Sequence, residues 1–196
     1  MTVGILGGTG AFGSALASRL RRLGEDVLIG SRTPKDGAVS NEEAARRAEL
    51  VVLSVPPGAV EPTVRGVADA LDGKILLSAA SPVVFRDGRP VVEAGPRSLA
   101  ELAQEAAPGA RVVAGFHTVA AKALAGDDPI AEDVLLAGDD ADAKAEVAAL
   151  AERIVMGRAV DAGRLESARW LETLTALLLN INRNYQSETG VRITGL

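Results

Sequence analysis

The sequence predicts an α/β fold with a doubly wound, mostly parallel sheet that helices cover on both faces. Two observations support this prediction. Short aliphatic runs alternate with segments of helical periodicity, and these runs are apolar throughout, as in strands that are buried on both faces. The chain has 196 residues, of which 47% are hydrophobic. That is enough for one domain with a core, or for one domain with a small appendage.

The opening segment predicts a strand, a glycine-rich turn, a helix and a second strand. Residues 2–6 are β-branched or aliphatic and are followed by the glycine-rich turn. Leucines then recur at helical spacing from Leu16 to Leu23, and Gly24 is typical of a helix C-terminus. Residues 27–29 form the next aliphatic run. Together these elements predict a βαβ unit.

The same alternation continues toward the C-terminus. A short helix is expected over residues 41–49, with Ser40 as its N-cap and Glu43 in the capping-box position. We further expect strands over residues 50–55, 74–77, 111–116 and 134–137, helices over 60–71, 98–106, 141–155 and 165–182, and an irregular, polar last dozen residues.

Composition and charge exclude several kinds of site. The 21 Lys and Arg against 26 Asp and Glu give a net charge of −5, which argues against general nucleic-acid binding. With no cysteine and only one histidine, His117, the chain has no disulfide, thiolate nucleophile or multi-histidine zinc site, and we expect no metal. No apolar run reaches the roughly 18 residues that span a bilayer, and no Lys or Arg precedes the apolar N-terminus. We therefore expect a cytoplasmic protein with no membrane partner.

The glycine-rich turn predicts a dinucleotide site. Gly8, Gly10 and Gly13 form a G-x-G-x-x-G motif after the first strand and at the start of a helix. The first glycine permits the tight turn, the second lets the backbone approach a pyrophosphate, and the third allows close packing of helix and strand. The helix N-terminus then faces the phosphates.

The end of the second strand favours NADP over NAD. An NAD site usually has an acid here that binds the ribose 2′-hydroxyl. This chain has Ser31 and Arg32 with Lys35 soon after, and no acid lies between Val27 and Lys35. A hydroxyl and a guanidinium bind a 2′-phosphate, which a carboxylate would repel.

Several catalytic mechanisms lack their residues. The Tyr-x-x-x-Lys pair of short-chain dehydrogenases is absent, because the single tyrosine, Tyr185, is followed four positions later by Thr189. There is no G-x-S-x-G elbow and no Walker-A lysine. This scarcity of acid–base groups favours direct hydride transfer to a flavin-like ring, which depends mainly on stacking and distance. Lys122 is the one competing proton donor, and a solvated helix lysine is its more ordinary interpretation.

The chain resembles the NADPH-dependent reductases of coenzyme F420, a deazaflavin. The resemblance covers nearly the whole chain. It implies a Rossmann-type domain over residues 1–138 that binds NADP, a small helical C-terminal lobe over 139–196 that completes the deazaflavin cleft, and a homodimer. The motifs that carry it are Ile5–Gly10, Gly30–Arg32, Asn41–Ala45, Phe116–Val119, Ala137–Asp140, Asp161–Gly163 and Leu171–Thr175.

The resemblance also implies which residues bind the two cofactors. His117 would lie against the deazaflavin as an orienting and electrostatic group, and Arg86, Arg89 and Arg97 are candidates for the anionic tail of F420. One departure is the segment from Arg32 to Asn41, which is shorter than in archaeal members. The expected cofactor-binding residues are Gly8, Thr9, Gly10, Ala11, Phe12, Gly13, Ser31, Arg32, Lys35, Pro56, Pro57, Ser81, Pro82, Val83, His117, Thr118, Val119 and Ala121.

The function that these observations favour is an oxidoreductase that transfers a hydride between NADP(H) and coenzyme F420. Two alternatives stay open. One is an NADPH-dependent reductase of the imine or 3-hydroxyacid type, although only about 60 residues follow the last expected strand, fewer than such enzymes use for their helical dimer domain. The other is a non-catalytic NADPH-binding regulatory protein, because the same phosphate-binding residues can bind NADPH without catalysing a reaction.

Overall fold

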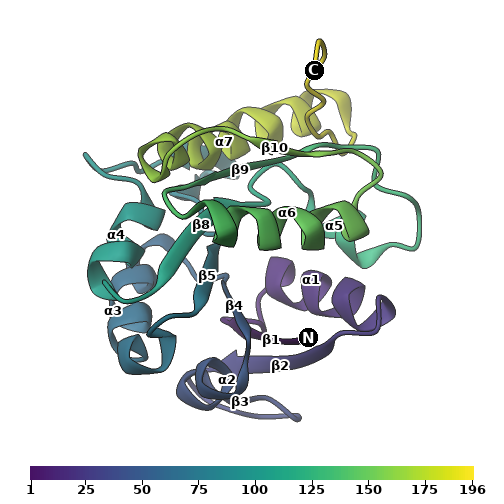
Figure 1. Cartoon of the computed structure of the whole chain (residues 1–196). Helices are drawn as coiled ribbons and strands as arrows, with labels where there is room; N and C mark the ends of the chain where they lie inside the picture. The colour runs from purple at the N-terminus through teal and green to yellow at the C-terminus, as the bar shows by residue number, and fades with distance from the viewer.

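The computed structural model describes residues 1–196 and is built around one eight-stranded sheet with helices on both faces (Figure 1). All neighbouring strands are parallel except β8 and β9, which are antiparallel. In spatial order the strands are β10 (Ala159–Asp161), β9 (Val134–Gly138), β8 (Arg111–Gly115), β5 (Ile75–Ser78), β4 (Leu50–Leu53), β1 (Thr2–Leu6), β2 (Asp26–Ser31) and β3 (Val39–Ser40). The predicted α/β, mostly parallel fold is confirmed.

Two hydrophobic clusters, one on each face of the sheet, form the core. One joins the central strands to α1 (Ala11–Arg22), α5 (Ala121–Ala125) and α6 (Ala141–Ile154). The other joins them to α2 (Asn41–Arg47), α3 (Val60–Arg65), α4 (Leu99–Ala106) and the start of α7 (Ala168–Tyr185). Strands buried on both sides explain the continuous aliphatic runs in the sequence.

The long C-terminal helix α7 is the last regular element and lies at the top of Figure 1, beside the C-terminal segment. A buried carboxylate fixes it to α4. Glu172 accepts hydrogen bonds from the backbone N–H groups of Leu99 and Ala100 at 2.9 and 3.0 Å. These amides lie in the first turn of α4, where the helix itself offers no partner. None of the helices has the length and apolar composition that a membrane crossing requires.

The structure corrects several predicted boundaries. The helix expected over 60–71 ends at Arg65, and Gly66 separates it from a 3-10 turn over Ala68–Leu71, because glycine is a poor helix former. The last helix starts with a 3-10 turn at Leu165–Ser167 and extends to Tyr185. The Ser40 cap is present, with Glu43 N–H donating to Ser40 Oγ at 3.0 Å, but the Glu43 carboxylate pairs with Arg47 instead of completing a capping box.

Six short elements were not predicted: β3, β10, α5, a 3-10 turn at Pro57–Ala59, and the hairpin strands β6 (Val83–Arg86) and β7 (Arg89–Val92). Each has five residues or fewer per segment. Elements this short show no hydrophobic periodicity in the sequence, and tertiary contacts define them.

Candidate active site

The candidate site lies where the chain leaves the carboxyl ends of the central strands. β1 pairs with β2 on one side and with β4 on the other. The chain crosses from β1 through α1 to β2, and from there back to β4. In doubly wound sheets, ligands bind at this switch point because the two crossovers diverge and leave a crevice.

The glycine turn between β1 and α1 is packed tightly at Gly7, Gly8 and Gly13 and open at Gly10. Gly7 has a φ of +75°, and a Cβ there would lie 2.3 Å from the Ser54 carbonyl oxygen. A Cβ on Gly13 would lie 2.7 Å from the Gly8 Cα. Gly10 is different, since the nearest atom to a Cβ there is the Gly7 oxygen at 3.4 Å. The turn therefore leaves space beside Gly10.

Gly10 is also the N-cap of α1, and no side chain caps this helix end. The next three backbone N–H groups, from Ala11 to Gly13, have no protein acceptor, whereas Ser14 N–H bonds to the Gly10 carbonyl. No acidic residue lies in the first turn of α1. Free amides and the positive end of the helix dipole fit a phosphate group here.

A first cavity of about 240 Å³, which we call the dinucleotide cavity, opens beside this turn. No carboxylate lines it. It brings together five expected residues, namely Thr9, Gly10, Ser31, Arg32 and Pro56, with seven that were not expected as cofactor-binding residues, namely Gly7, Thr33, Asn41, Ser54, Val55, Ala59 and Thr63. Asn41 Oδ1 is buried in this region without a hydrogen-bond partner.

Arg32, which lines the dinucleotide cavity, and Lys35, three residues further along the chain, are unpaired cations. The side chains of Arg32 and Lys35 are in exposed residues and make no hydrogen bond or ion pair, whereas most other Arg and Lys side chains do. The Ser31 hydroxyl accepts a bond from Thr33 N–H at 3.2 Å, which leaves its proton free to donate. This set of charges and donors fits a 2′-phosphate.

A second cavity of about 280 Å³, which we call the ring cavity, is mostly apolar. Phe12 lines it, only two residues beyond Gly10, so the start of α1 borders both cavities. The expected residues on its wall are Phe12, Ser81, His117, Thr118, Val119 and Ala121, and those that were not expected are Ala79, Phe116, Ala120, Thr175, Leu178, Leu179, Asn182 and Thr189.

The end of β8 has a strained backbone that aims residues into the ring cavity. The strand was expected to include Phe116, but it ends at Gly115, and Phe116 is buried with a φ of 66°. A bulky residue rarely adopts this left-handed conformation. The turn carries His117 and Thr118 out of the sheet plane to the wall of the cavity.

A chain of hydroxyl groups ties three segments together at this wall. Thr175 Oγ1 on α7 donates to the His117 carbonyl oxygen at 2.9 Å. A hydroxyl has one proton, so the 2.8 Å contact between Ser81 Oγ and Thr175 Oγ1 has Ser81 as the donor. The segment after β5, the end of β8 and α7 are therefore fixed to one another at the ring cavity.

His117 is held neutral in a defined tautomer. Its Nε2 lies 3.1 Å from the Ala80 carbonyl oxygen, so Nε2 carries the proton and Nδ1 is an acceptor. Burial lowers the pKa of His117 to about 4, while the Ala80 bond opposes this shift. His117 Nδ1, Thr118 Oγ1 and Ser78 Oγ are buried without partners in the protein. Unpartnered buried polar atoms are rare and fit a site that a ligand completes.

Several expected residues lie outside both cavities. Gly8 and Gly13 form the packed part of the glycine turn, and Ala11 starts α1. The roles expected for these three and for Lys35, Pro57, Pro82 and Val83, which also line neither cavity, stay predictions.

The competing proton donor and the arginine candidates also lie elsewhere. The Lys122 side chain is 85% exposed and pairs with Glu188 at 2.7 Å, which raises the pKa of Lys122. It does not line the ring cavity. Of the three arginine candidates, Arg86 and Arg97 form ion pairs with glutamates and Arg89 has no partner.

The residues that sequence reasoning missed are mainly on α7 and after it. Thr175 belongs to the Leu171–Thr175 motif, which the resemblance singled out without giving a role. Asn182 lines the cavity from the same face of α7 as Thr175 and Leu178, whereas Thr189 has no signal in the sequence, because it reaches the ring cavity only through the turn that follows α7.

Comparisons with known proteins agree with this geometry. A family model described as "NADP oxidoreductase coenzyme F420-dependent" matches residues 2–82, the part that holds the glycine turn and Arg32. The F420-dependent NADP reductase of Methanothermobacter marburgensis is 36% identical over an alignment that covers 100% of this chain and 99% of the relative. That of Methanocaldococcus jannaschii is 33% identical with the same coverage.

Solved structures show the same relationship. A candidate F420-dependent NADP-reductase from Arthrobacter sp. FB24 superposes with a TM-score of 0.89 at 28% identity, over 100% of both chains. An imine reductase from Streptomyces aurantiacus gives 0.61 at 21% identity and covers 95% of this chain and 62% of that one, which is a likeness of fold alone. Because the identity to the two archaeal enzymes extends over its whole length, this chain belongs to the family of F420-dependent NADP reductases.

Proposed function

We propose that this protein transfers a hydride between NADP(H) and coenzyme F420. The observation that carries the proposal is that the start of α1 borders both cavities, since Gly10 lines the dinucleotide cavity and Phe12 lines the ring cavity. A dinucleotide whose phosphates bind the α1 amides has its nicotinamide end beside the ring cavity. When bound, NADPH would supply the hydride, and the deazaflavin ring would accept it together with a proton from solvent.

The protein's own groups bind and orient the two rings. The α1 amides hold the pyrophosphate, and Arg32, Ser31 and Lys35 hold the 2′-phosphate. The apolar wall of the ring cavity excludes water and presents flat surfaces, so that two rings stack at hydride-transfer distance. Neutral His117 offers an acceptor at Nδ1, and its ring orients the deazaflavin without adding charge.

The test mixes purified protein, NADPH and F420 and follows loss of the visible absorbance of the deazaflavin. NADH and FMN replace NADPH and F420 in parallel reactions. We expect turnover with NADPH and F420 and much slower turnover with either replacement. Tight NADPH binding with no hydride transfer to any flavin or deazaflavin would support the non-catalytic alternative instead.

The imine- or hydroxyacid-reductase alternative needs a proton donor at the substrate heteroatom. Lys122 was the candidate, and its exposed ion pair with Glu188 lies outside the ring cavity. A Lys122→Ala variant should therefore keep its F420 reduction. Loss of all activity in this variant, together with no detectable F420 reduction in the wild type, would favour the alternative.

We also propose that residues 1–138 hold the dinucleotide and that residues 139–196 complete the ring cavity. Thr175, Leu178 and Asn182, all on α7, support this division because they line the ring cavity together with Phe12 of α1. Limited proteolysis with and without each cofactor tests it. Each cofactor should protect the part that contacts it.

A homodimer is the assembly that we propose, formed through the outer face of α7. Trp170 is 69% exposed and Leu177 is 56% exposed. In chain order, Trp170, Leu174, Leu177 and Ile181 follow one another at spacings of four, three and four residues, which places them on one face of α7. An exposed apolar stripe of this kind marks a contact surface. We expect a dimer by light scattering and a monomer for Leu177→Glu.

We place the protein in the cytoplasm, where NADPH is available. Cell fractionation tests this placement.

A further inference from the structure

The turn after α7 forms part of the rim of the ring cavity. Gln186 has a φ of 50°, and this left-handed residue reverses the chain so that Thr189 returns to Asn182. Both Thr189 and Asn182 line the cavity. The backbone N–H and the hydroxyl of Thr189 both donate to Asn182 Oδ1, at 2.8 and 2.6 Å. A backbone N–H cannot accept, so this contact fixes which atom of the amide is the oxygen.

The orientation leaves the other half of the amide available. Asn182 Nδ2 donates to no protein atom, and it is not sealed in the interior. Much of the wall around it is apolar, including Phe12, Leu178 and Leu179. One accessible N–H donor at the edge of an apolar cavity fits a flat ring that has a carbonyl at its edge.

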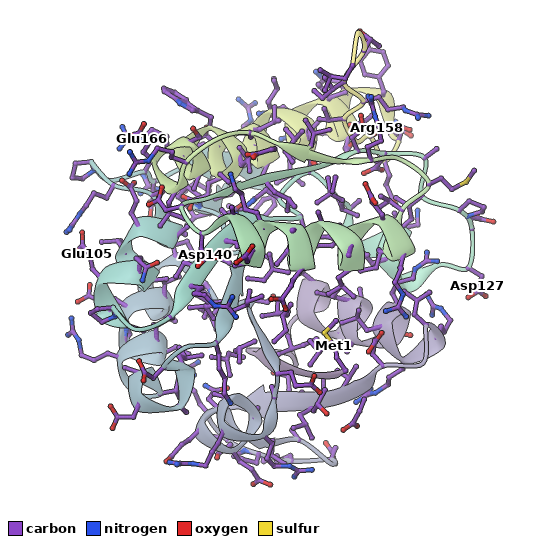
Figure 2. The ribbon with its side chains drawn as sticks, viewed as in Figure 1. Met1, Glu105, Asp127, Asp140, Arg158 and Glu166 are labelled. Carbon is purple, nitrogen blue, oxygen red and sulfur yellow. The ribbon has the colours of Figure 1, made fainter.

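The segment that orients Asn182, residues 189–196, is itself clamped to the sheet. Asp133 is fully buried just before β9, and its N–H donates to the Val191 carbonyl oxygen at 2.7 Å. Its carboxylate accepts the N–H of Ile193 at 2.7 Å and that of Arg158 at 2.8 Å. The Arg158 guanidinium donates to the carbonyl oxygens of Ile193 and Leu196 at 2.6 and 2.8 Å. Figure 2 shows Arg158 beside this segment.

The clamp lies just before β9 and the edge strand β10, so it connects the sheet to a segment that has no regular structure of its own. The two backbone N–H groups that donate to the Asp133 carboxylate and the nearby Arg158 charge favour its ionised form, and the pKa of Asp133 is lowered, chiefly by the backbone N–H bonds. A segment of eight residues with this many fixed contacts does not move freely, and Thr189 at its start stays on Asn182.

We propose that Asn182 is a specificity-determining residue for the second ring, donating a hydrogen bond from its NH2 group to a ring carbonyl. Asp133 and Arg158 are positioning residues that keep this donor in place through residues 189–196. The inference rests on the proposed function, because the pyrimidinedione edge of a deazaflavin carries such carbonyls. The inference assigns Asn182 Nδ2 as the donor to that edge of the ring, and it explains why residues 189–196 are held in place.

Asn182→Asp tests the donor. The aspartate keeps an oxygen for Thr189 but replaces the NH2 group with a second, charged oxygen that repels a carbonyl. We expect the Kd for F420, measured by quenching of the deazaflavin fluorescence, to rise at least about tenfold. The Kd for NADPH should stay within about twofold, and the melting temperature should change little because the Thr189 contacts remain.

Arg158→Met tests the clamp, because methionine removes both guanidinium bonds without a large loss of volume. Hydrogen exchange at the Ile193 amide should accelerate at least about tenfold, and the Kd for F420 should rise by about threefold or more. Arg65→Met is the matched control, since Arg65 forms an exposed pair with Glu61 on α3 and lines neither cavity. It should change neither quantity.

Three results would overturn the inference. An unchanged F420 Kd in Asn182→Asp, with wild-type protein that reduces F420, would overturn it and leave the proposed function intact. An equal rise in the NADPH Kd would also overturn it, because the donor would then serve the nicotinamide. Wild-type protein that does not bind F420 would overturn the proposed function and this inference together.

Discussion

Two alanine substitutions in one glycine turn should separate ligand binding from folding. At Gly13 a Cβ would lie 2.7 Å from the Gly8 Cα, a backbone atom that cannot turn aside. Overpacking of this kind destabilises by about 1–3 kcal/mol. For a chain of this length, that lowers the melting temperature by roughly 3–10 °C. At Gly10 the nearest atom is 3.4 Å away and φ is −72°, so an alanine fits the free protein without strain.

Gly10→Ala should therefore keep the wild-type melting temperature and lose NADPH affinity. Its methyl group occupies the space through which a pyrophosphate reaches the α1 amides. The loss of one or two charge-assisted hydrogen bonds, at about 1.5–3 kcal/mol each, weakens binding by about tenfold or more. The assay pairs thermal melting without ligand with calorimetric titration of NADPH. The space beside Gly10 is not a pyrophosphate site if Gly10→Ala melts at as low a temperature as Gly13→Ala, or if it binds NADPH as tightly as the wild type.

Three further predictions concern charge. Arg32→Ala should raise the KM for NADPH about tenfold to a hundredfold with little effect on NADH, and equal effects on both would refute its contact with the 2′-phosphate. His117 has its pKa lowered from 6.5 to about 4, so the folded state resists its protonation. The free energy of unfolding should fall by about 2 kcal/mol between pH 7.5 and pH 5, and denaturant melts of His117→Asn should show a smaller fall. Burial raises the pKa of Glu172 from 4.5 to about 7, although its two hydrogen bonds with backbone N–H groups oppose this shift. Ionising Glu172 is therefore harder in the folded state than in the unfolded state, and the free energy of unfolding falls as the pH rises. Glu172→Gln should reduce the loss of stability between pH 5 and pH 8 by about 2–3 kcal/mol, and an unchanged pH profile would contradict this.

The parts of the fold and site that the sequence predicts are those set by neighbouring residues. A strand, three spaced glycines and a helix define the turn at Gly10 locally. The end of the next parallel strand must then emerge beside it, which is why Ser31 and Arg32 were expected near the phosphates. The long amphipathic helices and the buried strands were predicted for the same reason, because periodicity depends on nearby positions only.

The rest depends on contacts between distant positions. Thr189 reaches Asn182 at the ring cavity because Gln186 turns the chain back, and Asp133 holds Ile193 in the same segment, a contact across 60 positions. No local sequence pattern predicts that Gln186 adopts a left-handed conformation or that the Asp133 carboxylate is buried and accepts two backbone N–H groups. The β6–β7 hairpin was missed because its strands are short and Phe85 is exposed, so no alternating pattern marks it.

The left-handed Phe116 has a consequence for engineering. This conformation costs roughly 1–2 kcal/mol in a bulky residue, and it is what turns the side chains after β8 toward the ring cavity. A laboratory screen that rewards heat resistance alone would favour variants in which this kink relaxes. Such variants would survive hotter incubation while losing turnover, so any directed evolution of this reductase should select for rate and thermal endurance in the same round.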